Sequence, residues 1–205
     1  MIITGTDTDV GKTIVAAMLT LGLEAKYLKP IQCGTQPESD VETVRRLTGL
    51  GADRILDTPI TLSQPLSPHL ASELDGVTID PDTLRLPKGR VVVEGAGGLM
   101  VPVTRQMLFI DLFAVWKRPV VLVARTGLGT LNHTLLSLEA LRKRQIEILG
   151  VVFVGDENPD NMKTIESIGA VKVLGRVPML DPLDANNLNQ VFKHNFNKFD
   201  FESML

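Results

Sequence analysis

Nine residues near the start of the chain carry the clearest chemical signal. Gly5-Thr6-Asp7-Thr8-Asp9-Val10-Gly11-Lys12-Thr13 follows a short apolar run and leads into a stretch with helical periodicity. A turn of this kind between a strand and a helix is a phosphate-binding loop, or P-loop, whose backbone N–H groups surround an anion. Its lysine reaches the terminal phosphates, and the hydroxyl after it binds Mg²⁺. The motif therefore predicts nucleotide use through Lys12 and Thr13, without identifying the reaction.

The loop departs from the usual pattern at one position. That pattern is glycine, four residues, then Gly-Lys-Ser/Thr. Here Thr6 stands where the first glycine is usual, and Gly5 comes one position early. The alternative is a chance turn before a helix, which the strand and helix patterns on either side disfavour.

Polar residues also follow two other apolar runs. Lys29 comes near the end of the second run, and Glu94 ends the run Val91–Glu94 before Gly95-Ala96-Gly97-Gly98. Open α/β sheets bind ligands beyond the carboxyl ends of their strands, so both residues are on the side where a ligand is expected. A carboxylate there suits a metal ion, and the glycines allow the backbone to approach a phosphate. A solvated lysine and an exposed strand end are the alternatives.

Two predicted helix starts offer further polar groups. Asp40 opens a helix after Ser39, and by itself such an aspartate is most simply an N-cap. The helix that begins at Thr130 follows Gly127 and Gly129. A helix N-terminus after glycines can bind a carboxylate, although an ordinary loop and cap would look the same.

These residues need a scaffold that brings strand ends together. Short apolar runs predict buried strands at Met1–Thr4, Tyr27–Pro30, Val91–Glu94, Val120–Ala124, Leu149–Val154 and Val171–Val177. Helices are predicted at Lys12–Glu24, Asp40–Thr48, Pro68–Leu74, Ile110–Val115, Thr130–Arg144 and Asp160–Ser167. Their alternation predicts an α/β fold, a three-layer doubly wound and mostly parallel sheet with helices on both faces.

The length of 205 residues predicts a single nucleotide-binding and catalytic domain over residues 1–205. The stretch Leu56 to Gly89 is rich in proline and lacks a clear period, so we expect an excursion on the rim of the sheet. Asn186–Phe201 is rich in Asn, Lys and Phe, and we expect a last helix with a loosely held tail after about residue 186.

The net charge and the cysteine content limit the classes of function and partner that this chain can have. Twenty-one basic and 24 acidic residues give a net charge of −3, which argues against a nucleic-acid partner. The single cysteine, Cys33, excludes an internal disulfide framework. There is no secretory signal and no apolar stretch long enough to span a membrane, so we expect a cytoplasmic protein without a membrane partner.

Taken together, the motifs resemble the dethiobiotin synthetase family, ATP-dependent ring-closing enzymes of biotin synthesis. The resemblance runs from residue 1 to about residue 180, and the last two dozen residues carry no such signal. The matching pieces are Gly5–Thr13, Lys29-Pro30, Gly34, Ser39-Asp40, Gln64–His69, Glu94–Gly98, Gly129–His133 and Gly175–Pro178.

The resemblance implies a homodimer that converts 7,8-diaminopelargonate, CO₂ and Mg-ATP into dethiobiotin. One amine captures CO₂ as a carbamate, whose oxygen attacks the γ-phosphate to give a carbamic–phosphoric anhydride. The second amine then closes the ureido ring and expels phosphate. Lys12 and Lys29 are implied as the catalytic residues, because two anions must be brought together against their repulsion.

The resemblance also assigns binding residues. Nucleotide contacts are implied for Asp9, Val10, Gly11, Lys12, Thr13, Ile14, Asp40, Glu94, Gly95, Ala96, Gly97, Val154, Pro178, Met179 and Leu180. Metal contacts are implied for Thr13, Asp40 and Glu94, which replaces the cap interpretation of Asp40. Substrate contacts are implied for Thr8, Lys29, Cys33 and, donated by the opposite subunit, Gly129, Thr130, Leu131 and Asn132.

Three departures from the family pattern affect these assignments. Cys33 stands where the family often has serine, and a thiol is the weaker hydrogen-bond donor. After the run Leu149–Val154 the family often has an asparagine that reads adenine, and Gly155-Asp156 offers no amide there. We therefore expect relaxed base selectivity, with backbone contacts around Pro178–Leu180. No residues could be matched to the far end of the diamine chain.

Three other functions remain possible from the sequence. A partitioning or septum-positioning ATPase would place a second lysine in the loop, where this chain has Asp7. A cobyrinate-type amide ligase would need a glutaminase domain with a cysteine nucleophile, and Cys33 stands in another context. A regulatory nucleotide-binding module would need fewer of the charged residues retained here.

Overall fold

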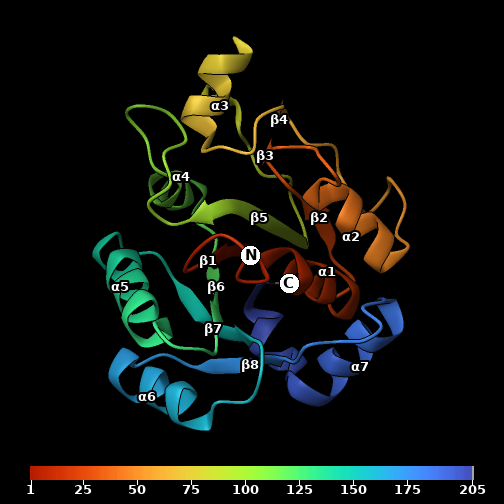
Figure 1. The fold of residues 1–205 in the computed structure, drawn as a ribbon, viewed down its shortest axis with the longest axis vertical. Helices are drawn as coiled ribbons and strands as arrows, with labels where there is room; N and C mark the ends of the chain where they lie inside the picture. Colours follow the sequence, from red (N-terminus) through yellow and green to blue (C-terminus); the bar gives the residue numbers. More distant parts are fainter. Residues whose placement is uncertain (205) are drawn as a thin grey trace.

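The structure, a computed structural model, describes residues 1–204. Within this range a parallel sheet has the strand order β2-β5-β1-β6-β7-β8 (Figure 1). Its strands are β1 (Ile2–Gly5), β2 (Lys26–Leu28), β5 (Val91–Gly98), β6 (Val120–Arg125), β7 (Ile148–Val154) and β8 (Val173–Val177). Each strand falls on one of the six apolar runs, so the predicted doubly wound fold is confirmed.

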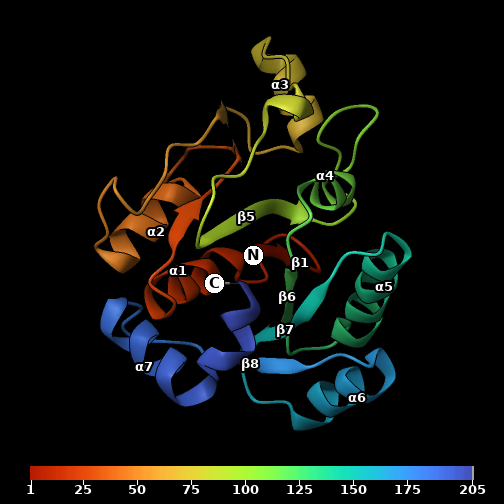
Figure 2. The ribbon, with the colours of Figure 1, turned by 180° about the vertical axis from the view of Figure 1, so that it is seen from behind.

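Helices cover both faces of this sheet (Figures 1 and 2). One face packs against α1 (Lys12–Gly22), α2 (Asp40–Thr48) and α7 (Ala185–Asn195), and the other against α4 (Phe109–Trp116), α5 (Thr130–Lys143) and α6 (Pro159–Gly169). Alternate residues of β6 serve the two cores: Val121 and Val123 face α1, whereas Leu122 faces α5 and α6. Burial on both faces explains why these runs are continuously apolar.

The rim excursion contains more regular structure than predicted. β4 (Ile60–Leu62) pairs in parallel with β3 (Ile31–Cys33) to form a second, two-stranded sheet, and α3 (Pro68–Asp75) and a 3₁₀ turn (Pro81–Thr83) follow. The helix predicted at Pro68–Leu74 corresponds to α3 and is confirmed. Strands of three residues are too short to show a period, which is why β3 and β4 were not predicted.

The prediction of a loosely held tail was wrong. Beyond α7, Phe196 and Phe201 are 8% and 0% exposed and belong to the core around α1. Their rings lie 6.1 and 6.3 Å from that of Phe192, and Lys172 Nζ lies 2.5 Å from the Asp200 carboxylate. The aromatic side chains fix the segment, and the surrounding Asn and Lys residues hide that signal in the sequence. Among residues 1–204, no helix has the length and apolar character needed to cross a membrane.

Candidate active site

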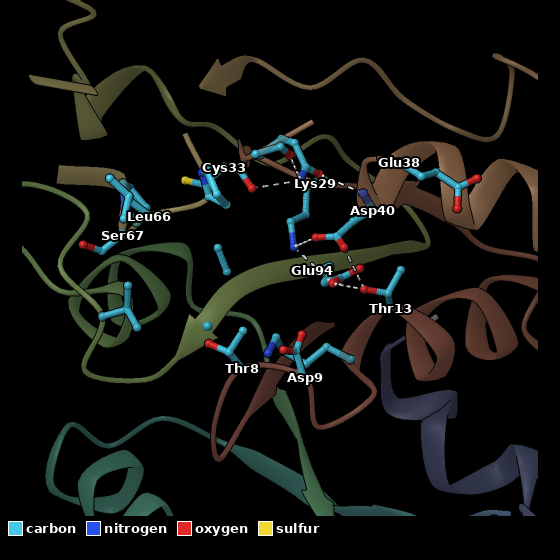
Figure 3. A pocket seen from close by; sticks show the side chains of 18 of the residues that line it. Thr8, Asp9, Thr13, Lys29, Cys33, Glu38, Asp40, Leu66, Ser67 and Glu94 are labelled. Atoms are coloured by element: carbon cyan, nitrogen blue, oxygen red, sulfur yellow. Dashed lines mark hydrogen bonds and ion pairs between the residues drawn. The ribbon is translucent and has the colours of Figure 1, made fainter. Parts of the chain in front are cut away.

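A cavity of about 870 Å³ opens where the P-loop and the carboxyl ends of β3 and β5 meet (Figure 3). Most of the residues predicted to bind ligands line it together. They are Thr8, Asp9, Gly11, Lys12, Thr13, Ile14, Lys29, Cys33, Asp40, Glu94, Ala96 and Gly97. Strand ends far apart in the sequence thus meet at one side of the sheet, as expected for an open α/β fold.

The P-loop is shaped by a glycine at the start of α1. Gly11 has φ 95°, and a Cβ atom there would lie 2.9 Å from a methyl group of Val154. Both the backbone conformation and the space therefore require glycine. Lys12 is buried, and its Nζ donates a hydrogen bond of 2.7 Å to the carbonyl oxygen of Asp7 within the same loop. The loop backbone thus wraps around the lysine that is predicted to reach the phosphates.

Lys29 lies at the charged centre of the cavity. Its Nζ is 2.6 Å from Asp40 Oδ2 and 3.1 Å from Glu94 Oε1 (Figure 3). The same ammonium group also donates to the carbonyl oxygen of Gly95. Lys29 is 2% exposed and Glu94 1% exposed. Burial by itself lowers the pKa of Lys29, but the two carboxylates outweigh this effect and raise it. The ammonium group therefore stays charged in a site shielded from water.

The two carboxylates and Thr13 form the second half of this centre. Thr13 Oγ1 lies 2.8 Å from Glu94 Oε1 and 3.1 Å from Asp40 Oδ1. Burial alone would raise the pKa of Asp40, but Lys29 and the Thr13 hydroxyl hold it below its usual range. Mg²⁺ prefers oxygen ligands and is commonly held by one or two carboxylates together with phosphate oxygens. The hydroxyl and carboxylate oxygens present here fit that ion.

Asp40 reaches this centre because another residue caps its helix. Ser39 is the N-cap of α2 and forms a capping box with Glu42, so the cap interpretation of Asp40 was wrong. The Asp40 carboxylate is thereby free to face Lys29 and Thr13. The backbone N–H of Asp40 donates to Gln32 Oε1, and Gln32 Nε2 donates to the carbonyl oxygen of Gly34. Gln32 therefore ties the start of α2 to β3.

Two buried polar side chains of the site were not predicted. Gln32 is one, and Tyr27 is the other, with a hydroxyl that donates to Glu94 Oε2 over 2.8 Å. Burial and the neighbouring carboxylate raise the pKa of Tyr27 well above its usual range, so the phenol remains a donor. One signal for Tyr27 was available in the sequence. Residues two apart in a strand point to the same face, and Tyr27 stands two residues before Lys29 in the predicted strand.

The opposite wall of the cavity is formed by Cys33 and the segment Pro65–Pro68 (Figure 3). Cys33 is half-buried, and burial raises the pKa of its thiol to about 11. The side chain is therefore a neutral thiol at ordinary pH. Gln64–His69 was matched to the family, but a cavity-lining role for Pro65, Leu66 and Ser67 was not predicted.

The remaining predicted residues do not line this cavity. Val10 and Gly95 are buried beside it, and Val154 packs against the position of Gly11. Pro178, Met179 and Leu180 follow β8 and are not among the residues that line the cavity. The helix start at Gly129, Thr130, Leu131 and Asn132 belongs to α5 on the other side of the P-loop. There Thr130 is buried against Thr134, Leu131 packs toward α6, and Asn132 is exposed.

Comparison with known proteins gives the family. Residues 1–187 match the family described as an AAA domain. The ATP-dependent dethiobiotin synthetase BioD of Rhodopseudomonas palustris (strain HaA2) is 54% identical over 203 residues, which are 98% of this chain and 95% of that protein. The protein of the same name from Agrobacterium fabrum (strain C58) is 54% identical over 202 residues, with coverage of 98% and 95%.

Solved structures at much lower identity share the fold. The septum site-determining protein MinD of Pyrococcus horikoshii, complexed with Mg-ADP, has a TM-score of 0.59 at 14% identity, covering 98% of this chain and 95% of that chain. A ParA family ATPase of Chlorobium tepidum has a TM-score of 0.58 at 11% identity, covering 97% and 93%. At such low identity, these structures support the assignment of the fold and nothing further about this chain. Because the relatives at more than 50% identity match nearly end to end, the chain belongs to the ATP-dependent dethiobiotin synthetase family.

Proposed function

We propose that this chain is an ATP-dependent dethiobiotin synthetase acting through a single catalytic domain, with 7,8-diaminopelargonate, CO₂ and Mg-ATP as substrates. The observation that carries the proposal is the convergence of Lys12, Lys29 and the pair Asp40–Glu94 on one cavity, in a chain whose relatives bear that name. A nucleotide-binding module would not require a buried second lysine between two carboxylates.

In the proposed reaction, one substrate amine attacks the carbon of CO₂ and loses a proton, which gives a carbamate. A carbamate oxygen then attacks the γ-phosphorus of ATP, and the bond to the leaving ADP oxygen breaks. Finally the second amine attacks the carbonyl carbon, loses a proton and expels phosphate as the ring closes. The central difficulty is the approach of two anions, the carbamate and the γ-phosphate.

The residues of this chain address that difficulty electrostatically. The Lys12 ammonium binds the β- and γ-phosphates from within the loop, and Lys29 stabilises the transferring phosphoryl group. Fixed charges in a water-poor site act strongly, because they need no reorganisation as the reaction proceeds. Thr13, Asp40 and Glu94 would hold Mg²⁺, which when bound would neutralise further phosphate charge. Thr8 in the P-loop and Cys33 on the opposite wall would contact the diamine.

Further parts of the proposal concern assembly and the base. The helix start at Gly129–Asn132 would serve the active site of a second subunit. Base selectivity would be relaxed and rest on the backbone around Pro178–Leu180. We place the enzyme in the cytoplasm.

The test is phosphate release by the purified chain with Mg-ATP and bicarbonate, with and without 7,8-diaminopelargonate. We expect strong stimulation by the diamine and a ureido product by mass spectrometry. Hydrolysis independent of the diamine would instead favour an ATPase of the partitioning class. Bound nucleotide without any turnover would favour the regulatory module.

A further inference from the structure

The Tyr27 side chain approaches the active site from inside the protein core. Tyr27 is 0% exposed and belongs to the apolar core around α1, on the side of Glu94 away from the cavity. β2 and β5 pair in parallel with Tyr27 opposite Val92, so Glu94 is two residues further along on the same face. A long side chain reaches such a diagonal neighbour. This register places the phenol hydroxyl 2.8 Å from Glu94 Oε2.

The two oxygen atoms of Glu94 consequently have separate partners. Oε1 faces the cavity, where the Thr13 hydroxyl and the Lys29 ammonium lie 2.8 and 3.1 Å away. Oε2 faces the core, and among residues 1–204 its hydrogen-bond donor is Tyr27 alone. Because Glu94 is 1% exposed, water does not readily replace a missing donor. Loss of the phenol hydroxyl would leave a buried carboxylate oxygen without a partner.

We propose that Tyr27 is a positioning residue, whose hydrogen bond to Oε2 sets the rotation of the Glu94 carboxylate so that Oε1 faces the Mg²⁺ site. The inference rests on the metal role given to Glu94 in the proposed function. Outer partners of this kind fix the orientation of a ligand and tune its basicity, and their loss typically weakens metal affinity or activity by 10- to 100-fold. Tyr27 itself touches no substrate.

The hydroxyl group, rather than the ring, is the informative part of Tyr27. Phenylalanine would fill the same apolar space and would need no hydrogen-bond partner. A buried phenol is favourable only where its hydroxyl finds an acceptor, and here that acceptor is a predicted metal ligand. The substitution Tyr27→Phe therefore separates packing, which it keeps, from positioning, which it removes.

The first experiment measures ADP affinity by calorimetry over a series of free Mg²⁺ concentrations, for the wild type and for Tyr27→Phe. ADP affinity without Mg²⁺ should be unchanged, because the P-loop is intact. Mg²⁺ should strengthen ADP binding in both proteins. The free Mg²⁺ concentration at which half of this increase in ADP affinity is reached should be roughly tenfold higher in the variant. A rise of less than twofold would overturn the proposal, whatever the turnover of the variant.

A matched control removes a buried hydroxyl that does not touch Glu94. Thr20 lies in α1, is 0% exposed, and its Oγ1 has no hydrogen-bond partner within the described residues. Thr20→Val should leave the Mg²⁺ dependence unchanged. If both variants shift it equally, Tyr27 acts through general packing and the proposal fails.

A second readout uses the wild type and so does not depend on folding of the variant. Tyr27 is the single tyrosine of the chain, so ring-¹³C-labelled tyrosine gives one assignable set of resonances. We expect the carbon bearing the hydroxyl to shift when Mg²⁺ joins the ADP complex, because Glu94 then shares its charge with the ion. An unchanged resonance would overturn the proposal. Both experiments use ADP without diamine, so a failed synthetase assay would leave their outcome readable.

Discussion

Replacing Lys29 by methionine keeps most of the side-chain volume and removes its charge. Lys29 is 2% exposed, so its ammonium acts in a site where solvent screening is weak. For a negative charge that develops about 4 Å from Nζ, an effective dielectric constant near 20 gives roughly 4 kcal/mol. That energy corresponds to about a thousandfold in rate. We therefore expect kcat to fall by about three orders of magnitude, while the affinity for ADP in EDTA changes less than fivefold.

The assay is diamine-dependent phosphate release, run beside calorimetric ADP binding. Lys26→Met is the matched control, since Lys26 lies three residues before Lys29 at the start of β2, is exposed, and should tolerate the change. Loss of kcat with retained binding identifies an interaction made mainly in the transition state. Equal losses of kcat and ADP affinity, or a fall in kcat below tenfold, would refute the electrostatic argument.

Four further predictions follow from particular contacts. Alkylation of Cys33 by iodoacetamide at pH 8, followed by mass spectrometry, should be about 100-fold slower than alkylation of a thiol with a pKa of 9. The reason is that the pKa of Cys33 is about 11, so little of the thiol is present as thiolate. A rate that levels off near pH 9 would contradict this. Gly11→Ala should weaken ADP binding at least tenfold in calorimetry, because its Cβ would clash with Val154; unchanged affinity would show that the loop adapts. Phe201→Ala should lower the free energy of unfolding in urea by about 3–5 kcal/mol, and a loss below 1 kcal/mol would restore the prediction of a loose tail. ATP, GTP and CTP at subsaturating concentrations should support similar rates of phosphate release, whereas a strong preference for ATP would disprove relaxed base selectivity.

The main sheet was predictable because its strands are buried on both faces. Such strands appear in the sequence as continuous apolar runs. Their alternation with helices leaves few possible topologies for the sheet. The strand pair β3–β4 was not predictable in this way, because three residues carry no period. The run predicted to end at Glu94 extends to Gly98, since the glycines after it continue the strand instead of breaking it.

Side-chain partners were harder to predict than positions. Lys29 and Glu94 were both predicted at strand ends from the sequence; Glu94 lies within β5 instead, but the two side chains do meet. The sequence alone did not show which of the two adjacent residues, Ser39 or Asp40, caps α2. Ser39 is the cap, which leaves the Asp40 carboxylate free for the site. Tyr27 was not predicted as a site residue, because a tyrosine in an apolar run is read as core and its hydroxyl has no visible partner until β2 and β5 pair.

The place of β1 in the sheet has a consequence for the order of events during synthesis. β1 is an inner strand, and its two neighbours are β5 and β6, which lie about ninety residues or more further along the chain. The phosphate-binding turn is synthesised before either neighbour of β1, so β1 gains its first partner when β5 has emerged and has partners on both sides only once residue 125 has emerged. Such long-range pairing is slow to form. β1 and the turn after it thus mature long after they are synthesised, and an interrupted translation product ending before β6 would leave one flank of β1 unpaired and open to association with other chains.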